Sequence, residues 1–165
     1  MSKLIYILIL LMVGGFLFLQ FRENIISGSS IQSPHVIINN HAVAVEIADE
    51  FNEWQQGLSD RKVLAENKSM LFVFPDRQVR CFWMKNMNFA LDIIWLDGEK
   101  IIKIDKDAQP EGKKPARKYS SVVPINYVLE VNAGWCDKHN IKTGDEVEFN
   151  YAKRLSHLTG LKNIY

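Results

Sequence analysis

Apolar and polar positions divide the chain into an apolar amino-terminal segment and a longer remainder in which short apolar runs alternate with turn residues. In the remainder, β-branched and aromatic residues recur at every second position or in short continuous runs, and both patterns are typical of β-strands. Strands are therefore expected at Val36–Ile38, Val43–Ile47, Met70–Phe74, Val79–Lys85, Leu91–Leu96, Ile101–Ile104, Tyr127–Val131 and Val147–Phe149.

Turn and cap residues between these runs indicate how the strands are connected. Asn39-Asn40-His41 and Asp97-Gly98 lie between apolar runs, and each predicts the turn of a β-hairpin. Asp49 is expected to open a short helix that ends at Gly57, and residues 133–139 can form further helical turns. Seven or eight strands with two or three short helices predict a mainly β fold (α+β in detail), either a compact β-sandwich or a partly closed barrel.

The first 27 residues are predicted to place the protein in a membrane. Residues 4–19 contain no charged side chain, and Lys3 and Arg22 flank them. Such a run spans roughly 24–27 Å as a helix, slightly less than the roughly 30 Å of a bilayer's hydrocarbon core. One transmembrane helix tolerates this shortness, and the basic residues favour a domain outside the cytoplasm. A cleaved signal peptide, which would leave a secreted or periplasmic domain, is the alternative.

The predicted organisation is an anchor or signal segment at residues 1–27, a linker at 28–34, a β domain at 35–151 and a tail at 152–165. Residues 28–165 carry 18 basic and 18 acidic side chains. A neutral domain lacks the positive charge of a general nucleic-acid binder, so no nucleic-acid partner is expected. The histidines have none of the short spacings that build a metal site. Neither a metal nor a cofactor is therefore expected.

Four sequence motifs occur in the order and spacing of a known family. They are Met70-Leu71-Phe72-Val73-Phe74, Phe82-Trp83-Met84-Lys85-Asn86, Leu91-Asp92-Ile93-Ile94 and Val128-Leu129-Glu130-Val131-Asn132-Ala133-Gly134-Trp135. Together they closely resemble the prokaryotic family called domain of unknown function 192, over roughly residues 34–150. The resemblance implies a compact, mainly β domain, often behind a signal peptide or anchor, with no known activity. The chain departs from the usual family residues Arg, Met, Thr and Pro at Gln56, Ser59, Met87 and Ala90.

Polar residues inside the most apolar parts of the chain form the candidate site. A buried charge costs several kcal/mol unless it is paired, so each of these residues needs a partner or a function. One interpretation is a ligand pocket with aromatic walls, in which Lys, Asp and Glu could also do acid–base work. The other is structural, with Asp92 capping a turn, Asn86 bonding loop backbone and Lys85 in an ion pair. The candidate ligand-binding residues are Trp83, Lys85, Asn86, Asp92, Glu130, Asn132 and Trp135.

Three functions remain open on these grounds. The first is a module that binds a small ligand, such as a saccharide or cell-envelope fragment, over Trp83 and Trp135, because aromatic faces stack on sugars. The second is an enzyme built on Lys85, Asp92 and Glu130, although no nucleophile with an adjacent base is visible and no catalytic residue is assigned. The third is an accessory partner of envelope proteins. Convergence of the polar residues in one cleft favours the first two functions, and dispersal favours the third.

The chain has two cysteines, Cys81 and Cys136, each beside an aromatic residue of a motif. In an extracytoplasmic domain the two could form a disulfide. Two free, buried thiols are the alternative, and the distance between their Cα atoms decides between them.

Overall fold

The structure is a computed structural model, and it describes residues 33–151. The predicted anchor at residues 1–27, most of the predicted linker and the tail at 152–165 lie outside the described residues. Neither of the two helices within residues 33–151 has the length and apolar character needed to cross a bilayer.

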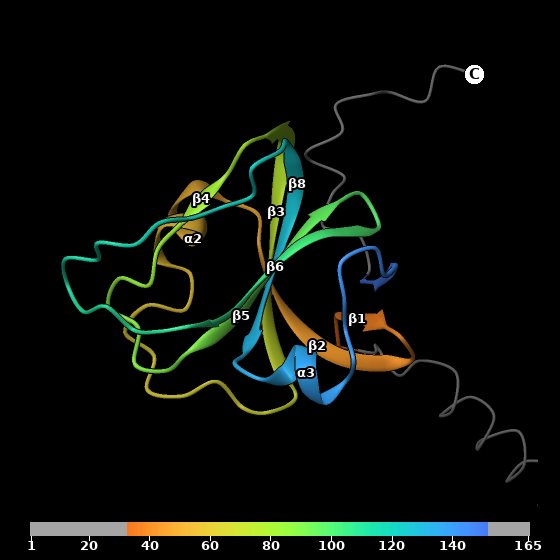
Figure 1. The fold of residues 1–165 in the computed structure, drawn as a ribbon, viewed down its shortest axis with the longest axis horizontal. Coiled ribbons are helices and arrows are strands. Elements are labelled where there is room, and N and C mark those ends of the chain that lie inside the picture. The colour runs from red at the N-terminus through yellow and green to blue at the C-terminus, as the bar shows by residue number, and fades with distance from the viewer. Residues whose placement is uncertain (1–32, 152–165) are drawn as a thin grey trace, which may run out of the picture. The chain divides into compact units, whose positions relative to one another are not determined.

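Nine strands in the described region form one large curled sheet and one small ribbon (Figure 1). The large sheet has the strand order β6-β5-β8-β3-β2-β1-β9, and β4 pairs with β7 in the ribbon. Strands β2 and β3 run parallel, and the other neighbouring strands run antiparallel. The strands are β1 (His35–Ile38), β2 (His41–Ala48), β3 (Lys68–Gln78), β4 (Cys81–Phe82), β5 (Leu91–Asp97), β6 (Lys100–Ala108), β7 (Tyr119–Ser120), β8 (Ile125–Asn132) and β9 (Val147–Asn150).

The two outer strands of the large sheet, β6 and β9, approach each other at one end. An antiparallel bridge joins Lys100 to Glu146, and the Val147 amide donates to the Glu99 carbonyl at 2.8 Å. The sheet therefore curls into a half-barrel, which confirms the mainly β prediction. Of the two predicted architectures, the partly closed barrel is the one that this single curled sheet matches, because a sandwich needs two facing sheets.

Both faces of the large sheet are covered. On β3, Leu71 and Val73 pack with one buried cluster, and Phe72 and Phe74 pack with another. The run from Met70 to Phe74 is fully buried, as expected for a strand that faces apolar neighbours on both sides. The second cluster lies on the side of α2 and β4.

The helix α2 (Phe51–Gln56) is fixed at both ends by its own sequence. A capping box joins Glu50 and Glu53 at its start, one residue later than the predicted opening at Asp49. Gly57 ends the helix with φ +49°, as predicted. A Cβ on Gly57 would lie 3.2 Å from the Phe72 ring, so the glycine also lets the chain pass close to the sheet. The second helix, α3 (Trp135–Lys138), is shorter than the predicted segment 133–139.

Two predicted strand boundaries are wrong. The strand β3 does not end at Pro75 but continues to Gln78, because its irregular pairing with β8 between Val73 and Gln78 leaves the proline exposed, where it has no ladder bond to break. The predicted strand Val79–Lys85 shrinks to β4, since its partner β7 offers only two residues. Beyond β4 the chain turns at Asn86, which has φ +55°.

Candidate functional site

A pocket opens between α2, the ribbon strand β4 and the face of the large sheet that carries Phe72 and Phe74. Its volume is about 280 Å³. The lining combines aromatic side chains with a few polar groups, and one carboxylic acid, that of Glu130, is among them. The lining residues are Phe51, Trp54, Gln55, Gln56, Gly57, Leu58, Ser59, Phe72, Phe74, Arg80, Cys81, Phe82, Trp83, Met87 and Glu130.

Glu130 lies on β8, in the middle of the sheet, with Met70 and Ile93 beside it on the two neighbouring strands. Its side chain is 5% exposed. No hydrogen bond or ion pair joins its carboxyl to another residue within 33–151. Burial raises the pKa of Glu130 to about 8, so the carboxyl holds its proton at neutral pH. A buried carboxyl with free hydrogen-bonding capacity therefore faces the pocket.

The aromatic walls hold one another in place. The Phe82 ring meets Phe72 edge-to-face at 4.8 Å between centroids, and the Trp54 ring lies 5.1 Å from Phe74. The indole nitrogen of Trp54 donates to the Ala48 carbonyl at 2.9 Å, which fixes the ring on the helix side of the pocket. Trp83 stands at the rim and is 45% exposed. These contacts give the pocket a wall that exists before any ligand arrives.

Arg80 adds a cation to the lining. Its guanidinium lies 4.1 Å from the centroid of Phe74 and forms an ion pair with the Asp76 carboxylate. The charge of Arg80 is therefore balanced from within the same chain segment. Its Nε atom is buried and finds no acceptor among the described residues.

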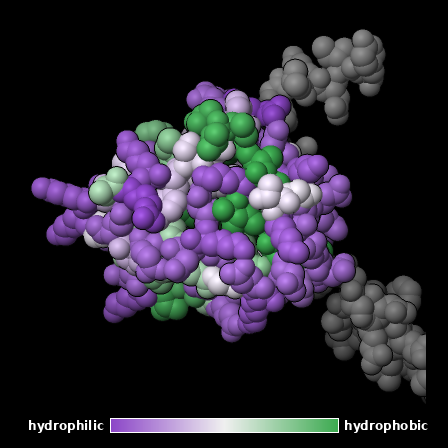
Figure 2. Space-filling model, viewed as in Figure 1, coloured by the Kyte–Doolittle hydropathy of each residue, from purple (hydrophilic) through white to green (hydrophobic). Residues whose placement is uncertain are grey.

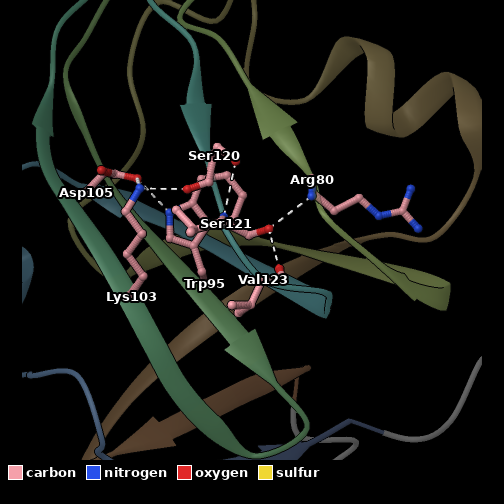
Figure 3. A network of polar contacts seen from close by, with 8 residues as sticks. Arg80, Trp95, Lys103, Asp105, Ser120, Ser121 and Val123 are labelled. Carbon is pink, nitrogen blue, oxygen red and sulfur yellow. Dashed lines mark hydrogen bonds and ion pairs between the residues drawn. The ribbon is translucent and has the colours of Figure 1, made fainter.

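The wall formed by the ribbon is tied to the sheet by the polar network in Figure 3. The Arg80 amide donates to the Ser121 hydroxyl, which in turn donates to the Val123 carbonyl at 2.7 Å. On the sheet side, Lys103 donates both to Asp105 and to the Ser120 carbonyl. The network holds β4 and its flanking loop at a fixed position over the sheet.

The predicted polar residues do not converge. Asp92 is fully buried on β5, where its two carboxylate oxygens accept the backbone N–H groups of Asp107 and Cys136, each at 3.0 Å. Lys85 is exposed, forms no ion pair with Asp92, and holds its ammonium 5.7 Å from the centroid of Trp83. The pairing of Lys85 with Asp92 is therefore absent, and Asp92 has the structural role of anchoring the start of α3.

The other predicted residues also separate. Asn132 donates to the carbonyls of Leu64 and Ala65, and Asn86 occupies a turn with positive φ. Trp135 belongs to the buried cluster on the other side of the sheet, beside His139 at 4.7 Å. Of the seven predicted residues, only Glu130 and Trp83 line the pocket.

Both cysteines are free in the structure, so the possible disulfide is not formed, and of the two free thiols only that of Cys136 is buried. Cys81 is exposed in the pocket lining, whereas Cys136 is buried in the cluster on the opposite side of the sheet. Burial, with the nearby Asp92 carboxylate, raises the pKa of the Cys136 thiol. The sheet separates the two sulfurs, and only Cys81 is accessible to solvent.

Sequence reasoning missed most of the pocket. The sequence predicts Trp54 within a helix and Phe72 and Phe74 within a strand, but their joint position in the pocket depends on how α2 folds back over β3. Arg80 was not singled out because it lies in a stretch predicted as a regular strand. Two signals did point here: Glu130, an acid between Leu129 and Val131 in an otherwise apolar run, and Trp83, an aromatic residue of a motif.

Comparison with known proteins places the chain among uncharacterised relatives. The model of the DUF192 family, described as "Uncharacterized ACR", matches residues 35–149. A crystal structure of a proposed transcription regulator from Sinorhizobium meliloti 1021 superposes with a TM-score of 0.66 at 29% identity, covering 73% of this chain and 96% of that one. A protein of unknown function from Novosphingobium aromaticivorans DSM 12444 gives a TM-score of 0.63 at 29% identity, covering 69% and 83% of the two chains. No curated protein matches the sequence.

Proposed function

The chain belongs to the DUF192 family, and from this premise we propose that it is a binding module for a small organic ligand held in the pocket beneath α2. The observation that carries the proposal is the buried, unpaired carboxyl of Glu130 in an aromatic pocket of about 280 Å³. Ligand sites are typically concave and mostly apolar, with a few polar groups that fix orientation. A saccharide or cell-envelope fragment, the ligand expected from the sequence, is one candidate that the test below includes.

Binding fits the lining better than catalysis does. Acid–base catalysis generally needs two groups with different protonation states on opposite sides of a reacting bond. Asp92 and Lys85, the expected partners of Glu130, are bonded elsewhere or exposed outside the pocket. The remaining ionisable groups of the lining are Arg80, which is paired with Asp76, and the thiol of Cys81.

The four tryptophans provide a direct test of ligand binding. Trp54 and Trp83 line the pocket, Trp95 packs behind Phe82, and Trp135 lies on the other side of the sheet as an internal control. The full chain labelled with 5-fluorotryptophan is titrated with N-acetylglucosamine, benzyl alcohol and benzyltrimethylammonium and followed by fluorine NMR. At least one probe should shift the Trp54 and Trp83 signals saturably and leave Trp135 unmoved. If no probe does so, the pocket is not a binding site.

Chemical modification of Cys81 should block ligand binding in the same pocket. Because Cys81 is exposed in the lining and Cys136 is buried, N-ethylmaleimide should react with Cys81 alone in the folded protein. The adduct should abolish the Trp54 and Trp83 shifts. The same treatment of the Cys81→Ser variant serves as control and should leave binding intact. Binding that survives alkylation of Cys81 would place the ligand elsewhere.

We further propose that residues 4–19 anchor the protein in a membrane with the β domain outside the cytoplasm. The uncharged length of this segment and its basic flanks support the proposal. The full-length chain should then remain with the membrane fraction after alkaline carbonate extraction. A mature amino terminus near Ser30 in a soluble periplasmic or secreted fraction would replace the anchor by a cleaved signal.

An interaction with envelope proteins is a second candidate, and one surface feature favours it. Figure 2 shows an apolar patch at the end of the sheet where β3 ends and β8 begins. Val79, Val122 and Val123 lie in the adjoining loops and are 51%, 70% and 46% exposed. Replacing all three by Ser should weaken capture of an envelope partner by cross-linking in intact cells. An unchanged cross-linking pattern would remove this candidate.

A further inference from the structure

We propose that the pocket beneath α2 receives an organic ammonium group, with the carboxylate of Glu130 and the surrounding aromatic faces as its binding partners. The inference rests on the proposed binding function and narrows it to one ligand class. Aromatic faces carry negative electrostatic potential and attract ammonium groups, and a carboxylate supplies the opposite charge. The pocket contains both kinds of partner in one lining.

The aromatic part of the lining already holds a cation. The Arg80 guanidinium lies 4.1 Å from the centroid of Phe74, and Asp76 neutralises it from the side. The rings of Trp54 and Phe82 lie 5.1 and 6.5 Å from Phe74 between centroids, and Phe82 in turn contacts Phe72. The indole N–H of Trp54 is bonded to the Ala48 carbonyl, so its contribution to the pocket is the ring. Besides Phe74, the aromatic side chains of the lining are Phe51, Trp54, Phe72, Phe82 and Trp83.

The polar groups of the lining argue against a ligand rich in hydroxyls. Gln56 donates to the Ser59 carbonyl at 2.9 Å, and the Ser59 hydroxyl donates to the Lys85 carbonyl at 2.9 Å. A saccharide needs several free hydrogen-bonding side chains, and of the three amide or hydroxyl side chains in the lining only Gln55 makes no hydrogen bond within the described residues. Glu130 remains as a buried carboxyl, and a single charged group would pair with its ionised form.

Ammonium binding would change the protonation state of the buried carboxyl. Without a ligand, burial holds the pKa of Glu130 near 8 and the group stays protonated. An ammonium ion would favour the ionised form, so binding releases a proton and affinity increases with pH up to about that value. The charged or titratable groups that share the lining with Glu130 are Arg80, before β4, and Cys81, within it. The lining residues from α2 are aromatic or amide side chains, and the neighbours on β3 and β5 are Met70 and Ile93.

A set of matched probes tests the ligand class. The full chain in zwitterionic lipid nanodiscs, labelled with 5-fluorotryptophan, is titrated with benzyltrimethylammonium, benzyl alcohol and benzoate, which share one ring and differ in charge. The cation should shift Trp54 and Trp83 at concentrations at least about tenfold below those of the other two probes. Neutral or anionic probes that bind as tightly as the cation would overturn the ammonium assignment while leaving the pocket as a binding site. Failure of all three probes and of N-acetylglucosamine would overturn both.

Two further measurements assign the effect to the carboxyl. The Glu130→Gln variant keeps the shape of the side chain and should lose about tenfold in affinity for the cation, a larger loss than for benzyl alcohol, which carries no charge. Should this variant not fold, the pH dependence of the wild type decides. Affinity for the quaternary cation, which does not itself titrate, should rise about tenfold between pH 7 and pH 9, the increase in the ionised fraction that a pKa near 8 gives. The rise should persist in the Cys81→Ser variant. A flat profile there, or an unaltered cation affinity in Glu130→Gln, would contradict the proposal.

Discussion

Glu130 carries its carboxyl into the apolar interior of the sheet, and its protonation links the stability of the protein to pH. Its folded-state pKa of about 8 lies above the unfolded value near 4.5. Below pH 4.5 Glu130 is protonated in both the folded and the unfolded state, so its burial does not lower stability through ionisation. Above that pH the unfolded state ionises first, so stability falls as pH rises, until the folded state also ionises near pH 8. Guanidinium unfolding should show a loss of up to about 3 kcal/mol between pH 5 and pH 8 from this group.

The Glu130→Gln variant isolates that contribution. It should be as stable as the wild type at pH 5 and more stable at pH 8, because glutamine cannot ionise. Glu148, an exposed acid on β9, offers a matched control, and Glu148→Gln should leave the pH profile of the wild type in place. Parallel pH profiles for wild type and Glu130→Gln would show that the carboxyl is not buried in solution.

Asp92 and Lys85 are expected to act independently in stability. Asp92→Asn removes the charge from two hydrogen bonds to backbone N–H groups and replaces one acceptor oxygen by a donor, which should cost about 2 kcal/mol. Lys85 is exposed, so Lys85→Met should change stability by less than about 0.5 kcal/mol. Urea unfolding of the double variant should give the sum of the two effects. Recovery of stability in the double variant would instead reveal a direct pair.

At the same scale, the sequence predicted which residues are unusual but not which of them meet. An acid between Leu129 and Val131 must be buried, and Glu130 is. Asp92 has the same apolar context, yet the N–H groups that it accepts come from Asp107 and Cys136, which only the folded chain brings to it. Lys85 follows a strand that ends earlier than its pattern suggests, so its side chain reaches solvent. Local hydropathy thus identifies burial, while the partners depend on tertiary contacts.

Among the elements, the connection between β7 and β8 contains a strained residue. Val122 has φ +67°, a conformation that β-branched residues strongly disfavour, and its side chain is 70% exposed. The hydroxyl of Ser121, which bonds both the Arg80 amide and the Val123 carbonyl, helps to hold this turn (Figure 3). Val122→Gly should therefore stabilise the protein by about 1 kcal/mol in thermal or urea unfolding. Val123→Gly, where no positive φ is relieved, should destabilise it and serves as control.

Elements with local signals were predicted well, and those that depend on a distant partner were not. The hairpin turn at Asn39 and Asn40, both with positive φ, and the stop at Gly57 are confirmed because the backbone conformation is encoded in the residues themselves. The length of β4 is set by β7, which is almost forty residues away in the sequence and short. The choice between sandwich and half-barrel likewise depends on which strand edges meet, and apolar alternation along one strand contains no information on that.

At the scale of the domain formed by residues 33–151, the last strand of the large sheet pairs with the first. Strand β9 pairs with β1 from His35 opposite Asn150 to Ile38 opposite Val147, and the Val147 amide also reaches Glu99 next to β6. A chain of residues 30–151 should be soluble and monodisperse and should unfold in one transition. Ending the chain at Asp145 should lower stability by at least about 3 kcal/mol, because a buried valine and the whole β1–β9 ladder are lost and the edge of β1 is exposed. Size-exclusion chromatography and urea unfolding of the two chains test this prediction. Equal unfolding midpoints would mean that the stability of the half-barrel does not depend on β9.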